Sequence, residues 1–445
     1  MFFAPSCALR LSNHRRRLLL CASILAILEE EEQVANYPFR GRYLGSNHIR
    51  RTRKEIESMF RELGQKARRA FKSNLEGFLQ IHDILEPYLI EQFGSSTRGR
   101  PNGVISTKLR LSAAMRFFCG ASTFDIQLTH GIGEASVYKS VYGVINAVNN
   151  CPHFHFNEDG GEFPNHEEQQ EIARGFFMKS GAEFDKVCMA IDGMLVWTVQ
   201  PTEQDCIDVG VGERSFHCFR KDKFGLLLLA GCDHKARFRW ADCSHPGIAS
   251  DYTAWMTSDI AQKLRDPNQQ IMAPGHTIVG DNAFVETNYM AIPIPGKNVT
   301  SEEDAYNFYL SQLRITIERA FGIMVHRFGI LRAPLSMSIK KVPPLVMCLM
   351  RLHNYFIDTS GRCTSAGLED DEAYIQYRAW RADSQAVFLD SNRVPADLLG
   401  SGHHRRDWAA RRNHHARVVH ADTPMRRMME EVARKGLARP ALNKH

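Results

Sequence analysis

The chain has 445 residues with a formal net charge of +6, and 44% of them are hydrophobic and 24% charged. This composition is typical of a chain that buries a core and excludes a wholly disordered protein, while a mean hydropathy of −0.32 excludes a polytopic membrane protein. Eleven cysteines occur without a Cys-x-x-Cys pair, which argues against a zinc ribbon or a disulfide framework and favours a reducing intracellular compartment. The length predicts two to three domains.

The N-terminal region, residues 1–100, is predicted to be variable and to carry helices. The apolar run at 18–28 follows basic residues but is too short to span a membrane. Four glutamates, Glu29 to Glu32, follow it where a secretion signal has its cleavage site, so we expect a short helix there. Helical spacing of apolar residues resumes over 55–95, before a turn-rich linker at 95–103.

Residues 101–150 are predicted to form a compact helical unit. Its helices begin near Thr107, Thr123 and Ser136, and glycines at 131–133 form the turn between the last two. This arrangement resembles a DNA-binding helix-turn-helix, although a helical hairpin in a plain bundle has the same pattern. Residues 151–184 read as a connector, and the cysteine and histidines at 151–155 lack the second half of a zinc site.

From residue 185 the pattern changes to short apolar runs that indicate buried strands. Four such runs lie at 187–192, 224–233, 237–243 and 276–281. Segments 252–264 and 285–291 are expected to be helical, and a long helix is expected from 301 to about 327. We therefore predict an α/β core with three adjacent strands, a fourth strand, and a helix that packs back on the sheet.

Four acidic residues fall at chemically suggestive places in this core. Asp192 ends the first strand, Asp281 ends the fourth, Asp251 follows the third after a short loop, and Glu318 lies on an apolar face of the long helix. Strand-end acids of adjacent parallel strands meet at one edge of a sheet, where clustered carboxylates suit Mg²⁺ or Mn²⁺. The alternative is that each aspartate caps a turn and that the glutamate is solvated or ion-paired.

Several segments in this order resemble PIF/Harbinger-type transposases, a family of DDE superfamily endonucleases. The segments are IDGMLVWTVQP (191–201), FRKDKFGLLLLAGCD (219–233), HPGIASDYTAW (245–255), IVGDNAF (278–284), ITIERAFGIMVHRFGIL (315–331) and LHNYF (352–356). The resemblance covers roughly 185–357 and implies a ribonuclease-H-like mixed sheet flanked by helices, preceded by an all-α helix-turn-helix unit. It also implies metal-dependent cutting of DNA and joining of the free 3′-hydroxyl to target DNA.

The resemblance also assigns roles to residues. Asp192, Asp281 and Glu318 match the family's catalytic acids and would bind the divalent metal, Mg²⁺ or Mn²⁺. Asp251 matches a further acid after the Pro-Gly turn and is a candidate metal ligand. Three arginines of the long helix are expected to contact the DNA backbone, with surface solvation as the alternative: Arg314, Arg319 and Arg327.

Departures from the family pattern support a second hypothesis. Met194 and Leu195 stand where the family usually has Thr-His, Ser250 replaces a common His, and Val325 replaces a basic residue. Since none of these is a metal ligand, they bear on catalytic competence more than on ancestry. The alternatives are a domesticated, catalytically weak or inactive DNA-binding or adaptor protein, and, less favoured, a nuclease that acts on RNA.

The C-terminal region, residues 358–445, is predicted to be a basic tail. Residues 401–445 carry 11 basic and four acidic side chains, so the rest of the chain is close to neutral. Such an excess is typical of a nuclear address or an arm that contacts a polyanion, or else of a solvated terminus. With the resemblance it predicts a nuclear protein whose partners are DNA and a Myb-like protein, with no membrane association and with a homo-oligomer left open.

Overall fold

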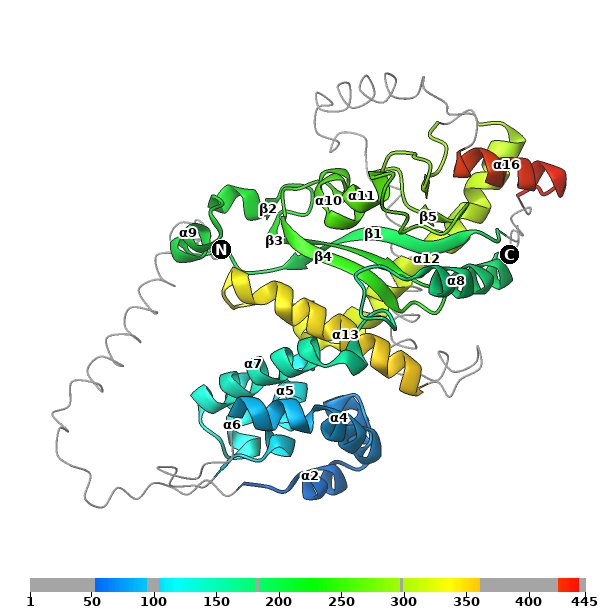
Figure 1. Cartoon of the computed structure of the whole chain (residues 1–445). Coiled ribbons are helices and arrows are strands. Elements are labelled where there is room, and N and C mark those ends of the chain that lie inside the picture. The colour runs from blue at the N-terminus through cyan, green and yellow to red at the C-terminus, as the bar shows by residue number, and fades with distance from the viewer. Residues whose placement is uncertain (1–52, 94–103, 181–183, 297–298, 361–422, 440–445) are drawn as a thin grey trace, which may run out of the picture. The chain divides into compact units, whose positions relative to one another are not determined.

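The computed structural model of the chain describes residues 53–93, 104–180, 184–296, 299–360 and 423–439. The chain divides into two units, Met1–Arg51 and Thr52–His445. The first unit lies outside the described residues, and with it the helix predicted at 18–28. The following description concerns the second unit (Figure 1).

Three helices open the described chain: α2 (Ile56–Leu63), α3 (Lys66–Phe71) and α4 (Leu75–Phe93). Their core is a group of aromatic rings, with Phe60 centred 4.6 Å from Phe71 and 5.3 Å from Phe78. These rings are almost fully buried, so the helical spacing read over 55–95 reflects a packed apolar face.

The helical unit at 104–150 contains α5 (Thr107–Phe118), α6 (Thr123–His130) and α7 (Glu134–Asn150). Ser106 and Ser122 cap the first two helices by accepting hydrogen bonds from Leu109 and Asp125 backbone N–H groups. Gly131 ends α6 with φ of 63°, a left-handed conformation that favours glycine. The three expected helices are therefore present, and a role in DNA binding remains a proposal.

The core is a mixed six-stranded sheet, in agreement with the predicted α/β class. Its strands are β1 (Val187–Trp197), β2 (His217–Cys218), β3 (Lys223–Cys232), β4 (Phe238–Pro246), β5 (Thr277–Val279) and β6 (Met290–Ala291). The path of pairing runs β2-β3-β1-β5-β6, and β4 also pairs with β3. β3 is antiparallel to β1 and β4, whereas β5 is parallel to β1 and β6.

Helices cover both faces of this sheet (Figure 1). One face packs on α8 (His166–Lys179), α12 (Ser301–Arg327) and α13 (Val342–Ser360), and the other packs on α10 (Asp251–Thr257) and α11 (Asp259–Arg265). β1 serves both cores, since Ala190 belongs to the first and Ile191 to the second. Such two-sided burial explains its apolar run at 187–191, which ends before Asp192.

The remaining elements are short or peripheral. They are α9 (Glu203–Val209), α16 (Pro424–Arg434) and the 3₁₀ helices η1 (Pro152–Phe154), η2 (Glu213–Phe216), η3 (Gly329–Arg332) and η4 (Ile339–Lys341). Within the described ranges, no helix is both long and apolar enough to cross a membrane.

Three sequence-based expectations differ from the structure. The predicted connector at 151–184 contains α8, which starts with a capping box of Asn165 and Glu168 and packs on β1. The helix expected at 252–264 is two helices, because Ser258 leaves the helical conformation and caps the second one. The helix expected at 285–291 is wrong: Met290 is fully buried and pairs with Ile278 of β5.

The basic tail also contains an ordered element. α16 packs against α12, with Met428 and Val432 buried, and Arg439 beyond it forms an ion pair of 3.3 Å with Asp304. Residues 361–422 of the tail lie outside the described residues. Part of the excess positive charge therefore sits on a helix that is docked on the core.

A buried ion cluster ties the turn between β3 and β4 together. Asp233 is fully buried, and its carboxylate accepts hydrogen bonds from Arg237 Nε at 2.8 Å and Arg239 Nε at 3.1 Å. Burial alone would raise the pKa of Asp233, but the charges of Arg237 and Arg239 hold this pKa well below its usual range. The carboxylate thus stays charged and stabilises the fold above the unfolded pKa, an effect lost as the pH falls through the folded value.

We expect Asp233→Asn to lower the free energy of unfolding by about 3 kcal/mol at pH 7, because it removes the buried carboxylate that Arg237 and Arg239 share and leaves each guanidinium only its second partner, Asp358 or Glu168. Urea denaturation measures this change. The exposed Asp185→Asn is the matched control and should unfold like the wild type. Equal stability of Asp233→Asn and Asp185→Asn would contradict the structural role of this cluster.

Candidate active site

Two of the predicted acids arrive side by side because β1 and β5 are parallel. The pairing between these strands ends at Ala190 and Val279, and Asp192 and Asp281 each lie two residues further along. β1 itself continues to Trp197, so the prediction that Asp192 ends the first strand is wrong, whereas Asp281 does follow the end of β5. Asp281 then begins a turn, in which its Oδ1 accepts a hydrogen bond of 2.7 Å from the Ala283 backbone N–H. Asp281 therefore caps a turn, as the alternative interpretation predicted, and it also lies beside Asp192.

The third acid reaches the same place from the opposite layer. Asp251 is the first residue of α10, is 8% exposed, and follows Ser250, which caps that helix. Its carboxylate lies over Gly193 of β1: a Cβ atom at position 193 would be 2.0 Å from Asp251 Oδ1. A side chain at position 193 would therefore displace the Asp251 carboxylate from its place over β1.

The three aspartates act on one another electrostatically. The pKa of Asp192 is raised to about 6, mainly by burial and to a smaller extent by Asp281 and Asp251, whereas the Gly193 N–H and Arg314 oppose the rise. The pKa of Asp251 is also raised, first by burial and then by Asp281. A shared site for three carboxylates is chemically unfavourable unless a cation or protons compensate it.

Glu318 forms an ion pair within α12. Its Oε1 lies 2.8 Å from Arg314 Nη1, one turn earlier on α12, and its side chain is 40% exposed. Because the charge of Arg314 also lowers the pKa of Asp192, this guanidinium lies within electrostatic range of both acids. The ion-pair interpretation of Glu318 is what the structure shows.

The donor chemistry of the site fits a hard divalent cation. The candidate ligands are carboxylates, which Mg²⁺ and Mn²⁺ prefer, and the raised pKa values of Asp192 and Asp251 are those expected of acids that lack a counter-charge. Among the residues that the structure describes, no three His, Cys, Asp or Glu side chains are already arranged around a common metal position. Binding would therefore need side-chain movement, above all by Glu318.

The three arginines expected to contact DNA have different environments. Arg314 is paired with Glu318, as above. Nε and Nη2 of Arg319 are buried without a hydrogen-bond partner, and its charge acts on Lys179. Arg327 is 3% exposed, and its Nη1 donates to the His353 carbonyl at 3.0 Å. The expectation for Arg327 is corrected: its side chain joins α12 to α13.

Two cations near the site did not appear among the predicted residues. Arg220 and Lys221 lie in the turn between β2 and β3, and their charges lower the pKa of Asp251 against the larger effect of burial. The signal was present in the sequence as the basic run FRKDK at 219–223. Because this run is far from Asp251 in the sequence, its proximity to Asp251 in the folded protein was not predicted.

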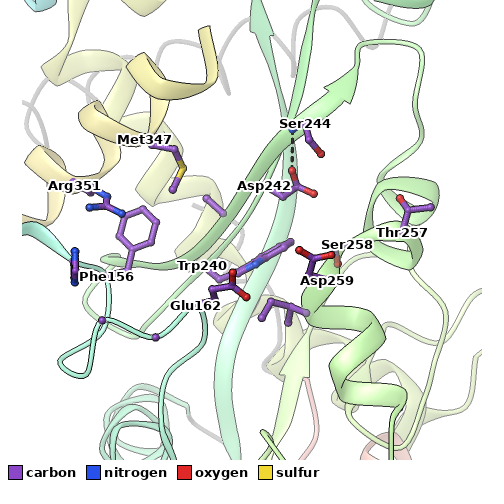
Figure 2. A pocket seen from close by; sticks show the side chains of 15 residues that line it. Phe156, Glu162, Trp240, Asp242, Ser244, Thr257, Ser258, Asp259, Met347 and Arg351 are labelled. Carbon is purple, nitrogen blue, oxygen red and sulfur yellow. Dashed lines mark hydrogen bonds between the residues drawn. The ribbon is translucent and has the colours of Figure 1, made fainter. Parts of the chain in front are cut away.

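A pocket elsewhere on the core is separate from this site (Figure 2). It has a volume of about 410 Å³, lies beside β4, and is lined by residues such as Trp240, Asp242 and Arg351. None of the four candidate acids lines it. The carboxylate site is therefore defined by the register of β1 with β5 and by the interactions among its aspartates, and not by this pocket.

A comparison with protein families found a match within the core. Residues 191–354 match the family model described as DDE superfamily endonuclease. The matched segment contains all four acids and supports a transposase-like nuclease domain of the DDE superfamily. Searches of curated proteins and of solved structures found no match.

We expect Asp192→Asn to raise the free energy of unfolding by about 1–2 kcal/mol at pH 7.5 in EDTA, because it removes one of three repelling carboxylates. The wild-type pKa of about 6 means that the difference should shrink towards pH 4.5, where the wild-type carboxyl is already neutral. Urea denaturation at both pH values measures it. If Asp192→Asn and the wild type have the same free energy of unfolding at pH 7.5, or if their difference grows on acidification, the clustering of acids would be contradicted.

Proposed function

We propose that this protein is a PIF/Harbinger-type, transposase-derived endonuclease that cuts DNA by divalent-metal-assisted phosphodiester hydrolysis and joins ends by transesterification. The observation that carries the proposal is the convergence of Asp192, Asp251 and Asp281 from two strands and a helix inside the segment matched to DDE superfamily endonucleases. The sheet, with three antiparallel strands followed by parallel β5 and the long α12, fits a ribonuclease-H-like core.

In this proposal Asp192, Asp281 and Glu318 hold the metal, and Asp251 is a further ligand. When bound, Mg²⁺ or Mn²⁺ would activate a water molecule and stabilise the leaving oxygen of a phosphodiester. The chain contributes the geometry: strand pairing positions two aspartates, Gly193 admits the third, and the Gly193 N–H orients Asp192 Oδ1 through a hydrogen bond of 2.8 Å. Arg314 supplies a positive charge beside Glu318. A DNA phosphate that binds Arg314 would replace the Glu318 carboxylate in this ion pair.

The helical unit of α5, α6 and α7 is proposed to bind DNA as a helix-turn-helix. It is joined firmly to the core, because Asn149 Nδ2 donates to the Pro344 carbonyl at 2.9 Å and Arg351 Nη1 donates to the Asn149 carbonyl at 2.6 Å. DNA held by this unit would thus be presented to the core in a defined orientation. A Myb-like partner, self-association and a nuclear location, supported by the resemblance and the basic tail, complete the proposal.

We expect Asp192→Asn and Asp281→Asn each to reduce Mn²⁺-dependent nicking of supercoiled plasmid DNA to below about 1% of the wild-type rate. Both substitutions remove a metal ligand while they keep the side-chain shape. Gel electrophoresis of the plasmid measures the rate. Asp259→Asn, an exposed aspartate of α11, is the control and should cut normally. Nicking that is equal in the wild type and both variants would contradict the proposed site.

A second candidate function is a DNA-binding or adaptor protein that has lost turnover. The ion pair of Glu318 with Arg314 favours it, because this carboxylate already has a positively charged partner within the protein. Met194 and Leu195 follow Asp192 where the family usually has Thr-His, which favours it too. Under this hypothesis the protein binds DNA in a salt-dependent manner without metal-dependent cleavage.

Metal binding separates the two functions without a cleavage assay. If the site is a working metal centre, millimolar Mn²⁺ should raise the thermal unfolding midpoint of the wild type, since ligands that bind only the folded state stabilise it. Asp281→Asn should abolish most of this increase. Differential scanning calorimetry measures the midpoint. An Mn²⁺ response identical in the wild type and Asp281→Asn would favour the adaptor.

A further inference from the structure

The turn between β2 and β3 exposes an aromatic ring next to two cations. Phe219 is 68% exposed, one of the most exposed large apolar side chains among the described residues. Arg220 and Lys221 follow it and are also exposed. Exposure of an apolar ring to water is unfavourable. Its position within a basic turn favours a partner that carries negative charge and has planar aromatic rings.

The turn is preorganised by contacts within residues 217–224. The His217 ring packs edge-on against Phe219 and Phe224, with centroids 4.8 Å and 5.0 Å away, and its Nε2 lies 3.2 Å from Asp222 Oδ1. The Lys221 N–H donates to the Cys218 carbonyl at 3.1 Å, and Asp222 has φ of 50°. Phe219 is therefore held exposed on an ordered support.

The turn is also connected to the carboxylate site through the backbone. Gly247 N–H donates to the Gly225 carbonyl, and Ile248 N–H donates to the Ser215 carbonyl, both at 2.9 Å. These bonds fasten the segment just before Asp251 to both sides of the turn. A Cβ at position 247 would lie 2.8 Å from the Gly225 carbonyl oxygen, so this close approach requires glycine. The charges of Arg220 and Lys221 accordingly reach Asp251.

We propose that this turn binds the DNA strand beside the carboxylate site, with Phe219 stacked on an unpaired nucleobase and with Arg220 and Lys221 on the flanking phosphates. Base stacking on an exposed aromatic ring tolerates any sequence, and the adjacent cations neutralise the backbone. This inference rests on the proposed function in taking DNA as the ligand. It adds a strand-positioning element that lies outside the metal ligands.

The test measures binding of fluorescein-labelled oligonucleotides by full-length protein in EDTA, using fluorescence anisotropy. One probe is a 20-nucleotide thymidine strand, and the other is an abasic strand of the same length and charge. Phe219→Ala should weaken binding to the thymidine strand about tenfold and leave binding to the abasic strand unchanged. Phe219→Trp should restore affinity for the thymidine strand, since tryptophan also offers a stacking surface.

Charge variants and a matched apolar control complete the design. The double variant Arg220→Gln, Lys221→Gln should weaken binding to both strands equally and reduce the dependence of affinity on salt. Ile207→Ala, at a position on α9 that is 66% exposed, should change neither affinity. Because these side chains are exposed, the variants should fold, which circular dichroism verifies.

The outcome is separable from that of the cleavage assay, because EDTA prevents metal-dependent chemistry. Unchanged thymidine-strand binding by Phe219→Ala, or an equal loss for both strands, would overturn the stacking role. Absence of binding to either strand by the wild type would overturn it as well, and would point to a protein surface or a second copy of the chain as the partner of Phe219. Unimpaired cleavage by Asp192→Asn would instead remove the proposed metal site and leave a positive stacking result standing.

Discussion

The parallel pairing of β1 with β5 is the constraint on which the site depends. Because Ala190 pairs with Val279, the two chains deliver Asp192 and Asp281 at the same level, just past the last paired residues. A parallel neighbour cannot be reached by a tight turn. The chain therefore crosses from β4 to β5 through α10 and α11, and the first helical residue of that crossover is Asp251. The connection that makes the strand pairing possible also supplies the third acid.

Two buried aspartates show how the surroundings decide the state of a carboxylate. Asp233 and Asp192 both experience burial that raises the pKa. At Asp233 two guanidinium groups outweigh burial, so the pKa falls and the charge stabilises the fold. At Asp192 the neighbours are mostly other carboxylates, and the pKa rises to about 6. The first arrangement is complete within the protein, whereas the second lacks a positive group that a divalent cation would provide.

The long helix α12 combines structural and site residues in one element. Its N-terminus carries a capping box of Thr300 and Glu303, and apolar residues such as Ile317 and Phe321 pack towards the sheet. Arg314 and Glu318 are one turn apart and pair with each other, while Arg327 near the C-terminal end is buried against α13. The position of each arginine along the helix therefore decides whether it pairs within α12 or is buried against α13. The side-chain chemistry, which they share, does not decide this.

Local sequence was sufficient for the elements whose pattern reflects burial. The apolar runs predicted the strands, and the acidic N-terminus and apolar spacing predicted the helix from 301 to 327. The same reasoning failed at 285–291, where pairing of Met290 with β5 overrides helical spacing, and at 151–184, where α8 was read as a connector. At 285–291 the deciding contact is pairing with another strand, which a helical pattern does not contain. At 151–184 the capping box of Asn165 and Glu168 was a local signal for α8 that the connector interpretation overlooked.

The sequence by itself determined that Asp192, Asp251, Asp281 and Glu318 are the acids to examine, because their positions next to apolar segments and the family resemblance are both legible in the linear order. Only the tertiary structure decided which of them meet. Register brings Asp192 to Asp281, the missing side chain of Gly193 admits Asp251, and an ion pair holds Glu318 to Arg314. It also decided that Arg327 is internal and that Arg220 and Lys221 act on the site. The reason is physical: charge–charge interactions depend on distance through space, and folding sets those distances independently of separation along the chain.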